Sequence, residues 1–63
     1  MLYLSEVLLQ EHDLASFEDV VKAVKARAQD GAMMFQVDVR PPFPDTPNDW
    51  EVRLESAFTS PGR

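Results

Sequence analysis

The stretch that decides the fold is SFEDVVKAVKARAQDG, residues 16–31. Its apolar residues recur every three or four positions, which is the spacing of one face of an α-helix; they are Phe17, Val20, Val21, Val24 and Ala28. Ser16 stands where a helix N-cap belongs, with Asp19 three residues later as in a capping box. Gly31 suits the position after the C-cap. We therefore predict a helix from Phe17 to Gln29.

The charges of this segment agree with the same helix. Glu18 lies near the positive N-terminal end of the helix dipole, and Arg27 lies near the negative end. Glu18 and Lys22 are also spaced for an ion pair across one helical turn.

Two segments after this helix alternate between apolar and polar residues, as strands with one buried face do. In MMFQVDVR, residues 33–40, one face carries Met33, Phe35, Val37 and Val39. In WEVRLESAF, residues 50–58, one face carries Trp50, Val52, Leu54, Ser56 and Phe58. Both segments are predicted to be strands.

The segment LYLSEVLL, residues 2–9, has apolar residues at both odd and even positions. Such a strand is typically covered on both faces. We predict a strand here, and a short helix from Ser5 to His12 is the alternative. A strand at this position forms a β-α-β unit with residues 33–40, whose right-handed crossover makes the two strands parallel.

The nine residues from Pro41 to Asp49 are more than a tight hairpin requires. A proline-stiffened link of this length can cross a central first strand, so we predict the strand order 2-1-3, with the simple hairpin order as the alternative. The predicted fold is α+β, with β-α-β-β order and one helix on a three-stranded mixed sheet. Residues 1–58 form the single domain, and residues 59–63 form a flexible tail.

The same proline-rich link contains two P-x-x-P spacings, from Pro41 to Pro44 and from Pro44 to Pro47. Recognition of such peptides by SH3-type domains favours a nearby basic residue, but acidic residues occupy the useful positions. We interpret the link as a structural loop. Phe43 is predicted to fold back onto the core, with an exposed anchor as the alternative.

Composition excludes several chemistries. The 63 residues include no cysteine and one histidine, His12, so disulfides and Cys-based or His-rich metal sites are excluded. No glycine-rich phosphate loop is present, and the acids near the proline link lack calcium-loop spacing. We expect no enzyme activity and no cofactor, with His12 as a solvated loop residue. The apolar start is too short for a membrane span and lacks a basic leader, which predicts a cytoplasmic protein.

Charge is the strongest indication of function. The net charge is −5, and residues 1–21 alone hold five acids and no lysine or arginine. Nucleic-acid binding requires a basic surface, whereas an acidic surface attracts a basic protein groove. We therefore expect a protein partner and no direct contact with nucleic acid or membrane. The candidate partner-binding residues are Glu6, Glu11, Asp13, Glu18, Asp19, Asp45, Asp49, Glu51 and Glu55.

A second candidate surface is the open face of the predicted sheet. It would carry Met34 and some of the first-strand leucines, with Asp38, Glu51, Arg53 and Glu55 around them. An apolar patch with a charged rim is typical of an interface. Small domains also tend to need support from a partner or second copy. The alternative function is therefore a homodimeric assembly module that pairs through this face or an edge strand.

In its size, acidity and predicted β-α-β-β order, the chain resembles the small inhibitor proteins that phages use against host machinery. Anti-CRISPR proteins and phage inhibitors of host RNA polymerase are the groups concerned, and no diagnostic motif is involved. The resemblance implies inhibition by occlusion, in which an acidic face enters the nucleic-acid groove of a basic partner and competes with phosphates.

Overall fold

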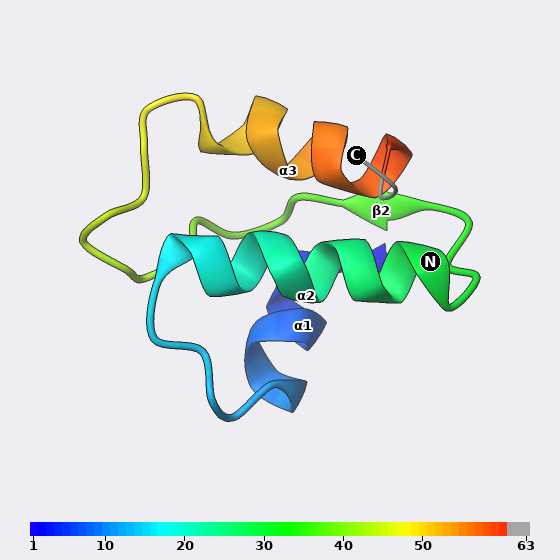
Figure 1. The fold of residues 1–63 in the computed structure, drawn as a ribbon, viewed down its shortest axis with the longest axis horizontal. Coiled ribbons are helices and arrows are strands. Elements are labelled where there is room, and N and C mark those ends of the chain that lie inside the picture. The colour runs from blue at the N-terminus through cyan, green and yellow to red at the C-terminus, as the bar shows by residue number, and fades with distance from the viewer. Residues whose placement is uncertain (61–63) are drawn as a thin grey trace.

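The computed structural model describes residues 1–60, and Figure 1 shows the order of the elements along them. They are β1 (Leu2–Tyr3), α1 (Leu4–Gln10), α2 (Phe17–Gln29), β2 (Phe35–Gln36) and α3 (Trp50–Thr59). Helices and strands are both present, but the chain is mostly helical. The prediction of one helix on a three-stranded sheet is wrong, and so are its 2-1-3 strand order and the hairpin alternative.

Helix α2 forms with the predicted bounds, and a capping box closes its N-terminus. The Ser16 hydroxyl accepts a hydrogen bond from the Asp19 backbone N–H at 3.4 Å. In return, the Asp19 carboxylate accepts from the Ala15 N–H at 2.9 Å. Two backbone donors that have no partner inside the helix are thus satisfied by side chains.

A Schellman motif closes the other end of α2. Gly31 has a φ of 108°, a left-handed conformation that costs glycine little. The Gly31 N–H donates to the Ala28 carbonyl at 3.2 Å, and the Ala32 N–H donates to the Arg27 carbonyl at 3.1 Å. These are the two bonds that define the motif, so the glycine stop predicted from the sequence is confirmed.

Residues 50–59 form α3 and not the predicted third strand. Four apolar residues recur at helical spacing in this segment. Leu54 and Ala57 are buried in the core, and Trp50 and Phe58 are half-buried against it. Val52, which a strand would bury beside Leu54, is 63% exposed. The strand and helix patterns share three apolar positions here, and packing against α2 favours the helical one.

The first apolar segment is also mostly helical. After the two residues of β1, the helix α1 runs from Leu4 to Gln10, close to the helical alternative and not the predicted strand. Leu4 and Val7 are fully buried, while Leu9 remains 76% exposed. A helix of seven residues is marginal alone, so its packing against the core stabilises it.

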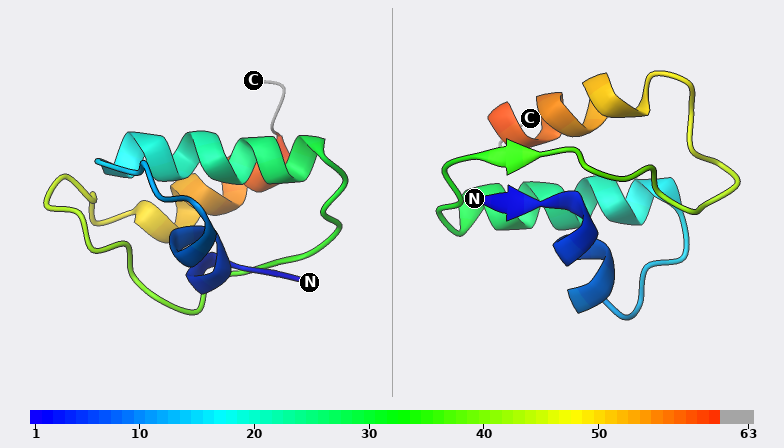
Figure 2. Two further views of the ribbon diagram at one scale, coloured as in Figure 1. Left: turned by 90° about the horizontal axis from the view of Figure 1, so that it is seen from below. Right: turned by 180° about the vertical axis from the view of Figure 1, so that it is seen from behind.

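The sheet is small, and its two strands run in parallel, as predicted for the segments that flank α2. Leu2 pairs with Phe35 and Tyr3 with Gln36. Figure 2 shows the two strands side by side, on the face of α2 that points away from the viewer of Figure 1. Because the chain turns into α1 at Leu4, β2 has a strand partner over only two residues, and the predicted strand 33–40 shortens accordingly.

The core lies where α2 meets the other two helices. Its buried apolar residues are Leu2, Leu4, Val7, Phe17, Val20, Ala23, Val24, Leu54 and Ala57. Helix α2 packs against α3 and, over a smaller area, against α1. Residues 1–60 therefore form no open face of a three-stranded sheet, which corrects the prediction from the sequence.

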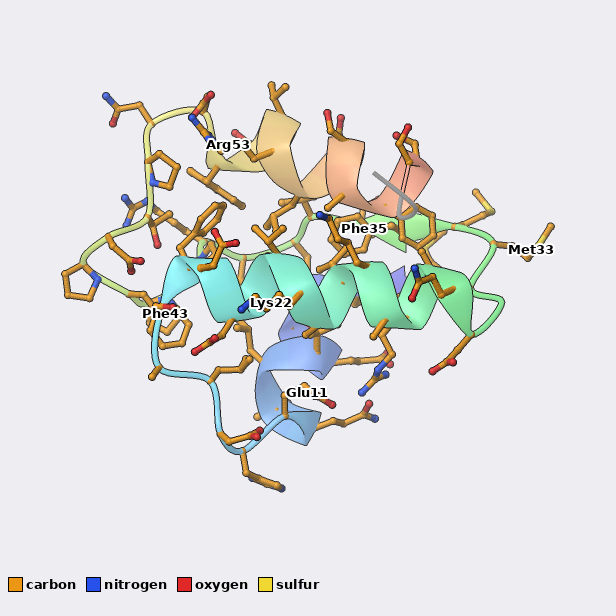
Figure 3. All side chains as sticks on the ribbon, in the orientation of Figure 1. Glu11, Lys22, Met33, Phe35, Phe43 and Arg53 are labelled. Carbon is orange, nitrogen blue, oxygen red and sulfur yellow. The ribbon has the colours of Figure 1, made fainter. Side chains whose placement is uncertain are left out.

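The proline-rich link joins β2 to α3 and folds onto the body of the protein. Pro41 is fully buried, Thr46 is buried, and the Thr46 hydroxyl donates to the Pro41 carbonyl at 3.4 Å. Phe43 is half-buried and packs against the core, which confirms that it folds back (Figure 3). The loop is thus held by contacts both within itself and with the core.

Helix α3 ends the described part of the chain. Of the expected tail 59–63, Thr59 is the last residue of α3 and Ser60 is its C-cap, while residues 61–63 lie outside the described residues. Within residues 1–60, no helix has both the length and the apolar composition that crossing a membrane requires.

Substitutions at neighbouring positions of α3 distinguish the helix from the predicted strand. Leu54→Ala removes a fully buried side chain and is expected to destabilise the protein by about 2–5 kcal/mol, enough to unfold much of it. Val52→Ser changes an exposed side chain and should alter the free energy of unfolding by less than about 0.5 kcal/mol. Urea unfolding followed by circular dichroism measures both. Equal losses for the two variants would contradict the helix.

Candidate functional site

The nine acids predicted to bind a partner fall into two groups in the structure. Asp45 belongs to the group that serves the fold. Both of its carboxylate oxygens accept from the Phe17 backbone N–H, at 3.0 and 3.1 Å. Phe17 is the first residue of α2, so Asp45 adds a capping carboxylate to the positive end of the helix dipole. The bond also fastens the proline-rich loop to α2.

Three more of the predicted acids are bound within the chain. Asp19 belongs to the capping box of α2. Glu11 forms an ion pair with Arg27 at 3.1 Å, which joins the end of α1 to α2. Asp49 pairs with Arg53 at 2.8 Å, and this hydrogen bond lowers the pKa of the Asp49 carboxyl. These carboxylates already have partners, so a binding protein would have to displace them.

The carboxylates of the other five predicted acids form no hydrogen bond or ion pair within residues 1–60. All five are exposed, and they are Glu6, Asp13, Glu18, Glu51 and Glu55. Glu18 and Lys22 do not form the ion pair that their spacing predicts within the described part of the chain. We refer to Glu6, Asp13 and Glu18 as the N-terminal acids, and to Glu51 and Glu55 as the α3 acids.

An acid outside the predicted set has a clear structural role. The Asp38 carboxylate accepts from the Ser5 hydroxyl at 2.7 Å and from the Ser5 backbone N–H at 3.1 Å. Ser5 lies in the first turn of α1, which has no side-chain cap at Tyr3. Asp38 therefore acts as the N-terminal acceptor for α1, and the Ser5 hydrogen bonds hold the pKa of its carboxyl below 3.8.

Three of the predicted acids meet at one hollow beside α2. Glu11, Asp13 and Asp19 line this space of about 260 Å³, and Lys22 lies at the same place. Figure 3 shows Glu11 at the end of α1, where it is the C-cap residue, and Lys22 on the exposed side of α2. The three acids outnumber Lys22 there, so the hollow keeps a net negative charge, part of which Arg27 offsets through its pair with Glu11.

A second hollow lies between α2 and α3. It encloses about 380 Å³ and is lined by Lys25 and Arg53, together with the side chains of Ser56 and Ser60. Arg53 is already paired with Asp49. The side chains that line this hollow include two cations and no acid.

A third hollow contains every methionine of the chain. Met1, Met33 and Met34 line it with Phe35, Phe58 and Glu55, and its volume is about 340 Å³. We call it the methionine hollow.

Sequence reasoning had placed Met34 on an exposed patch with Glu55 at its rim, and both lie here. It missed Met1, Met33, Phe35 and Phe58, because these residues come together only through the fold. The one available signal was the pair of adjacent methionines after Gly31. Adjacent residues of a strand point to opposite faces, so a strand with one buried face leaves one of the two methionines exposed.

The described residues offer no arrangement for metal binding. Within residues 1–60, no group of three His, Asp or Glu side chains is placed to hold a metal ion. His12 is exposed in the loop after α1, as predicted. The site chemistry that remains is that of surfaces: free carboxylates and one apolar hollow.

Comparison with protein-family models, with curated proteins and with solved structures gave no match for this chain.

The contact between Asp45 and Phe17 predicts a measurable loss of stability. Asp45→Ala removes the capping carboxylate and is expected to lower the free energy of unfolding by about 1 kcal/mol. Asp13→Ala is the matched control, because that exposed acid has no partner among the described residues and should cost less than about 0.5 kcal/mol. Urea midpoints at constant slope give both values. Similar losses for the two variants would show that Asp45 caps nothing.

The lowered pKa of Asp38 predicts how stability changes with pH. Because the folded pKa lies below the ordinary value of 3.8, this group stabilises the folded state above pH 3.8, and the effect disappears as the pH falls through the lowered pKa. The difference in melting temperature between the wild type and Asp38→Asn should therefore be present at about pH 6 and decrease as the pH falls through the lowered pKa. A carbon-detected NMR titration should find the Asp38 midpoint below 3.8, and Ser5→Ala should return it towards 3.8. A midpoint that ignores Ser5→Ala would contradict the assignment.

Proposed function

We propose that this chain is a non-enzymatic protein-binding module whose free carboxylates bind a basic surface of a partner. The observation that carries the proposal is the division of its acids. Four of the nine predicted acids cap helices or pair with arginines, and the remaining five are exposed without partners among residues 1–60. Meanwhile Arg27 and Arg53 are neutralised inside the chain. The charge left for a partner is thus mainly negative.

An acidic surface of this kind supports a specific mode of action. Basic protein grooves that bind nucleic acid attract carboxylates for the same electrostatic reason that they attract phosphates. The proposed module occupies such a groove and inhibits by excluding the nucleic acid. Of the features that carry the resemblance to phage inhibitor proteins, small size and acidity remain, whereas the β-α-β-β order does not.

The N-terminal acids are the better candidates for this contact. They come from α1, the following loop and the first turn of α2. Removing their charge leaves the capping contacts of Asp19 and Asp45 in place. Of the nine acids predicted from the sequence, Glu6, Asp13 and Glu18 are therefore the ones proposed to make this contact.

The alternative function, a homodimeric assembly module, has lost part of its basis. It was to pair through the open face of a three-stranded sheet, and the structure has two strands of two residues each. An edge of this length offers few backbone hydrogen bonds to a second copy. Light scattering at micromolar concentration separates a dimer from a monomer.

The experiment compares the wild type with the neutralised variant Glu6→Gln/Asp13→Asn/Glu18→Gln. Each protein is immobilised and used to capture proteins from a lysate of its own source, at about 50 and about 300 mM NaCl. The partner should bind the wild type at low salt, and the variant should bind it at least about tenfold more weakly, because electrostatic complementarity is lost. The wild type should then displace a labelled nucleic acid from the purified partner, measured by fluorescence anisotropy.

The comparison variant is Glu51→Gln/Glu55→Gln, which neutralises the α3 acids and should weaken binding less than neutralising the N-terminal acids does. Circular dichroism confirms that each variant keeps its helices. Binding that is indifferent to salt and to both variants would rule out the electrostatic contact. A partner that binds the wild type and nucleic acid together would rule out occlusion.

A further inference from the structure

The methionine hollow lies where three distant parts of the chain meet. Met1 precedes β1, Met33 and Met34 precede β2, and Phe58 lies in the last turn of α3. Figure 3 shows Met33 extending from the end of the molecule opposite Phe43. None of the N-terminal acids lines the hollow.

Its floor is a stacked pair of aromatic rings, and its walls are exposed methionine side chains. Phe35 and Phe58 stack with ring centroids 5.2 Å apart and an angle of 20° between the rings. Met33, Met1 and Met34 are 89%, 65% and 59% exposed. Unbranched methionine side chains adapt to ligands of different shape and are common at surfaces that bind apolar anchors. The arrangement suits the insertion of one large apolar side chain.

The charges around the hollow indicate which kind of residue should flank the apolar side chain of a ligand. Glu55 lines the hollow, and Glu51 lies one turn earlier on the same helix. Both acids are exposed and have no partner among residues 1–60. None of the lining side chains is basic, and the amino group of Met1 is the one cation among the lining residues. A ligand that fits this surface carries an apolar anchor with basic residues beside it.

We infer that the methionine hollow binds a basic amphipathic helix of a partner protein, with an apolar side chain of that helix inserted between the three methionines. Such helices place anchors on one face and cations on the flanks, which matches an apolar hollow with an acidic rim. A second copy of this chain fits less well. A two-fold contact through the hollow would bring two acidic rims into one interface, and each chain carries a net charge of −5.

The three methionines also provide the measurement. Because all of them line the hollow, a protein labelled with ¹³C at the methionine methyl groups gives NMR signals from this surface alone. The probe is a synthetic amphipathic helix of leucine and lysine, about 16 residues long, which is enough for a stable bound helix. The control probe has the same lysines and length, with serine in place of leucine. The methyl signals should shift saturably with the first probe and stay unchanged with the second.

Two variants and one matched control locate the contact. Met33→Ser/Met34→Ser should weaken binding of the leucine–lysine probe by about tenfold or more, because it removes apolar area from the contact. Glu55→Lys should weaken it by about threefold, the scale of an exposed ion pair. Leu9→Ser changes a similarly exposed apolar side chain on α1 and should leave binding unchanged.

Three results would overturn the inference. Methyl signals that do not respond to the leucine–lysine probe would show that the hollow does not accept a helix. Equal responses to both probes would show that charge alone is recognised. Methyl shifts that depend on the protein's own concentration, without any probe, would assign the hollow to a second copy.

The result is independent of the proposed function. If the methyl signals respond but neutralising the N-terminal acids leaves partner binding intact, the hollow is a docking site and the electrostatic proposal fails. If partner binding needs the N-terminal acids while the methyl signals never respond, the proposed function stands and this inference fails.

Discussion

The burial of α2 on two sides is the interaction on which the rest of the structure depends. Val20 and Val24 are fully buried, and Phe17 and Ala23 are nearly so. A chain of 63 residues has little other apolar surface to bury, and an isolated helix of this length is marginal in water. The apolar stripe of α2 therefore needs partners along its length, and α1 and α3 provide them. Both segments are helical because a helix brings leucine and alanine side chains onto the stripe where a strand would turn half of them away.

The position of α2 also decides which acids are free. Its N-terminus leaves backbone donors without partners, and the acids within reach are used to satisfy them. The Asp38 carboxylate likewise accepts a hydrogen bond from a backbone N–H in the first turn of α1. Glu6 and Glu18 also lie in the first turns of these helices, but their carboxylates accept no hydrogen bond from the described residues and remain on the surface. The methionines are excluded in a comparable way, since the core is complete without them. The two candidate binding surfaces are thus what remains after α2 has been capped and buried.

The sequence predicts α2 to the residue, because capping, spacing and the glycine stop are all local signals. It does not predict α3, because the strand and helix patterns share Trp50, Leu54 and Phe58 and differ only in whether Val52 or Ala57 is buried. It lists the acids but cannot separate the bound from the free, since the partners are distant: Asp45 and Phe17 are 28 residues apart. Sequence alternation does place Met34 beside Glu55 on an exposed patch. The rest of the methionine hollow depends on tertiary contacts between segments 1, 33–36 and 55–59.

Backbone assignment by NMR tests the two-sided burial of α2 most directly. The ¹³Cα secondary shifts should be helical without interruption from Trp50 to Thr59, and NOEs should connect the Leu54 methyl groups to valine methyl groups of α2. Extended shifts over those residues, with amide NOEs that pair them to Leu2 and Tyr3, would restore the three-stranded sheet and contradict this structure.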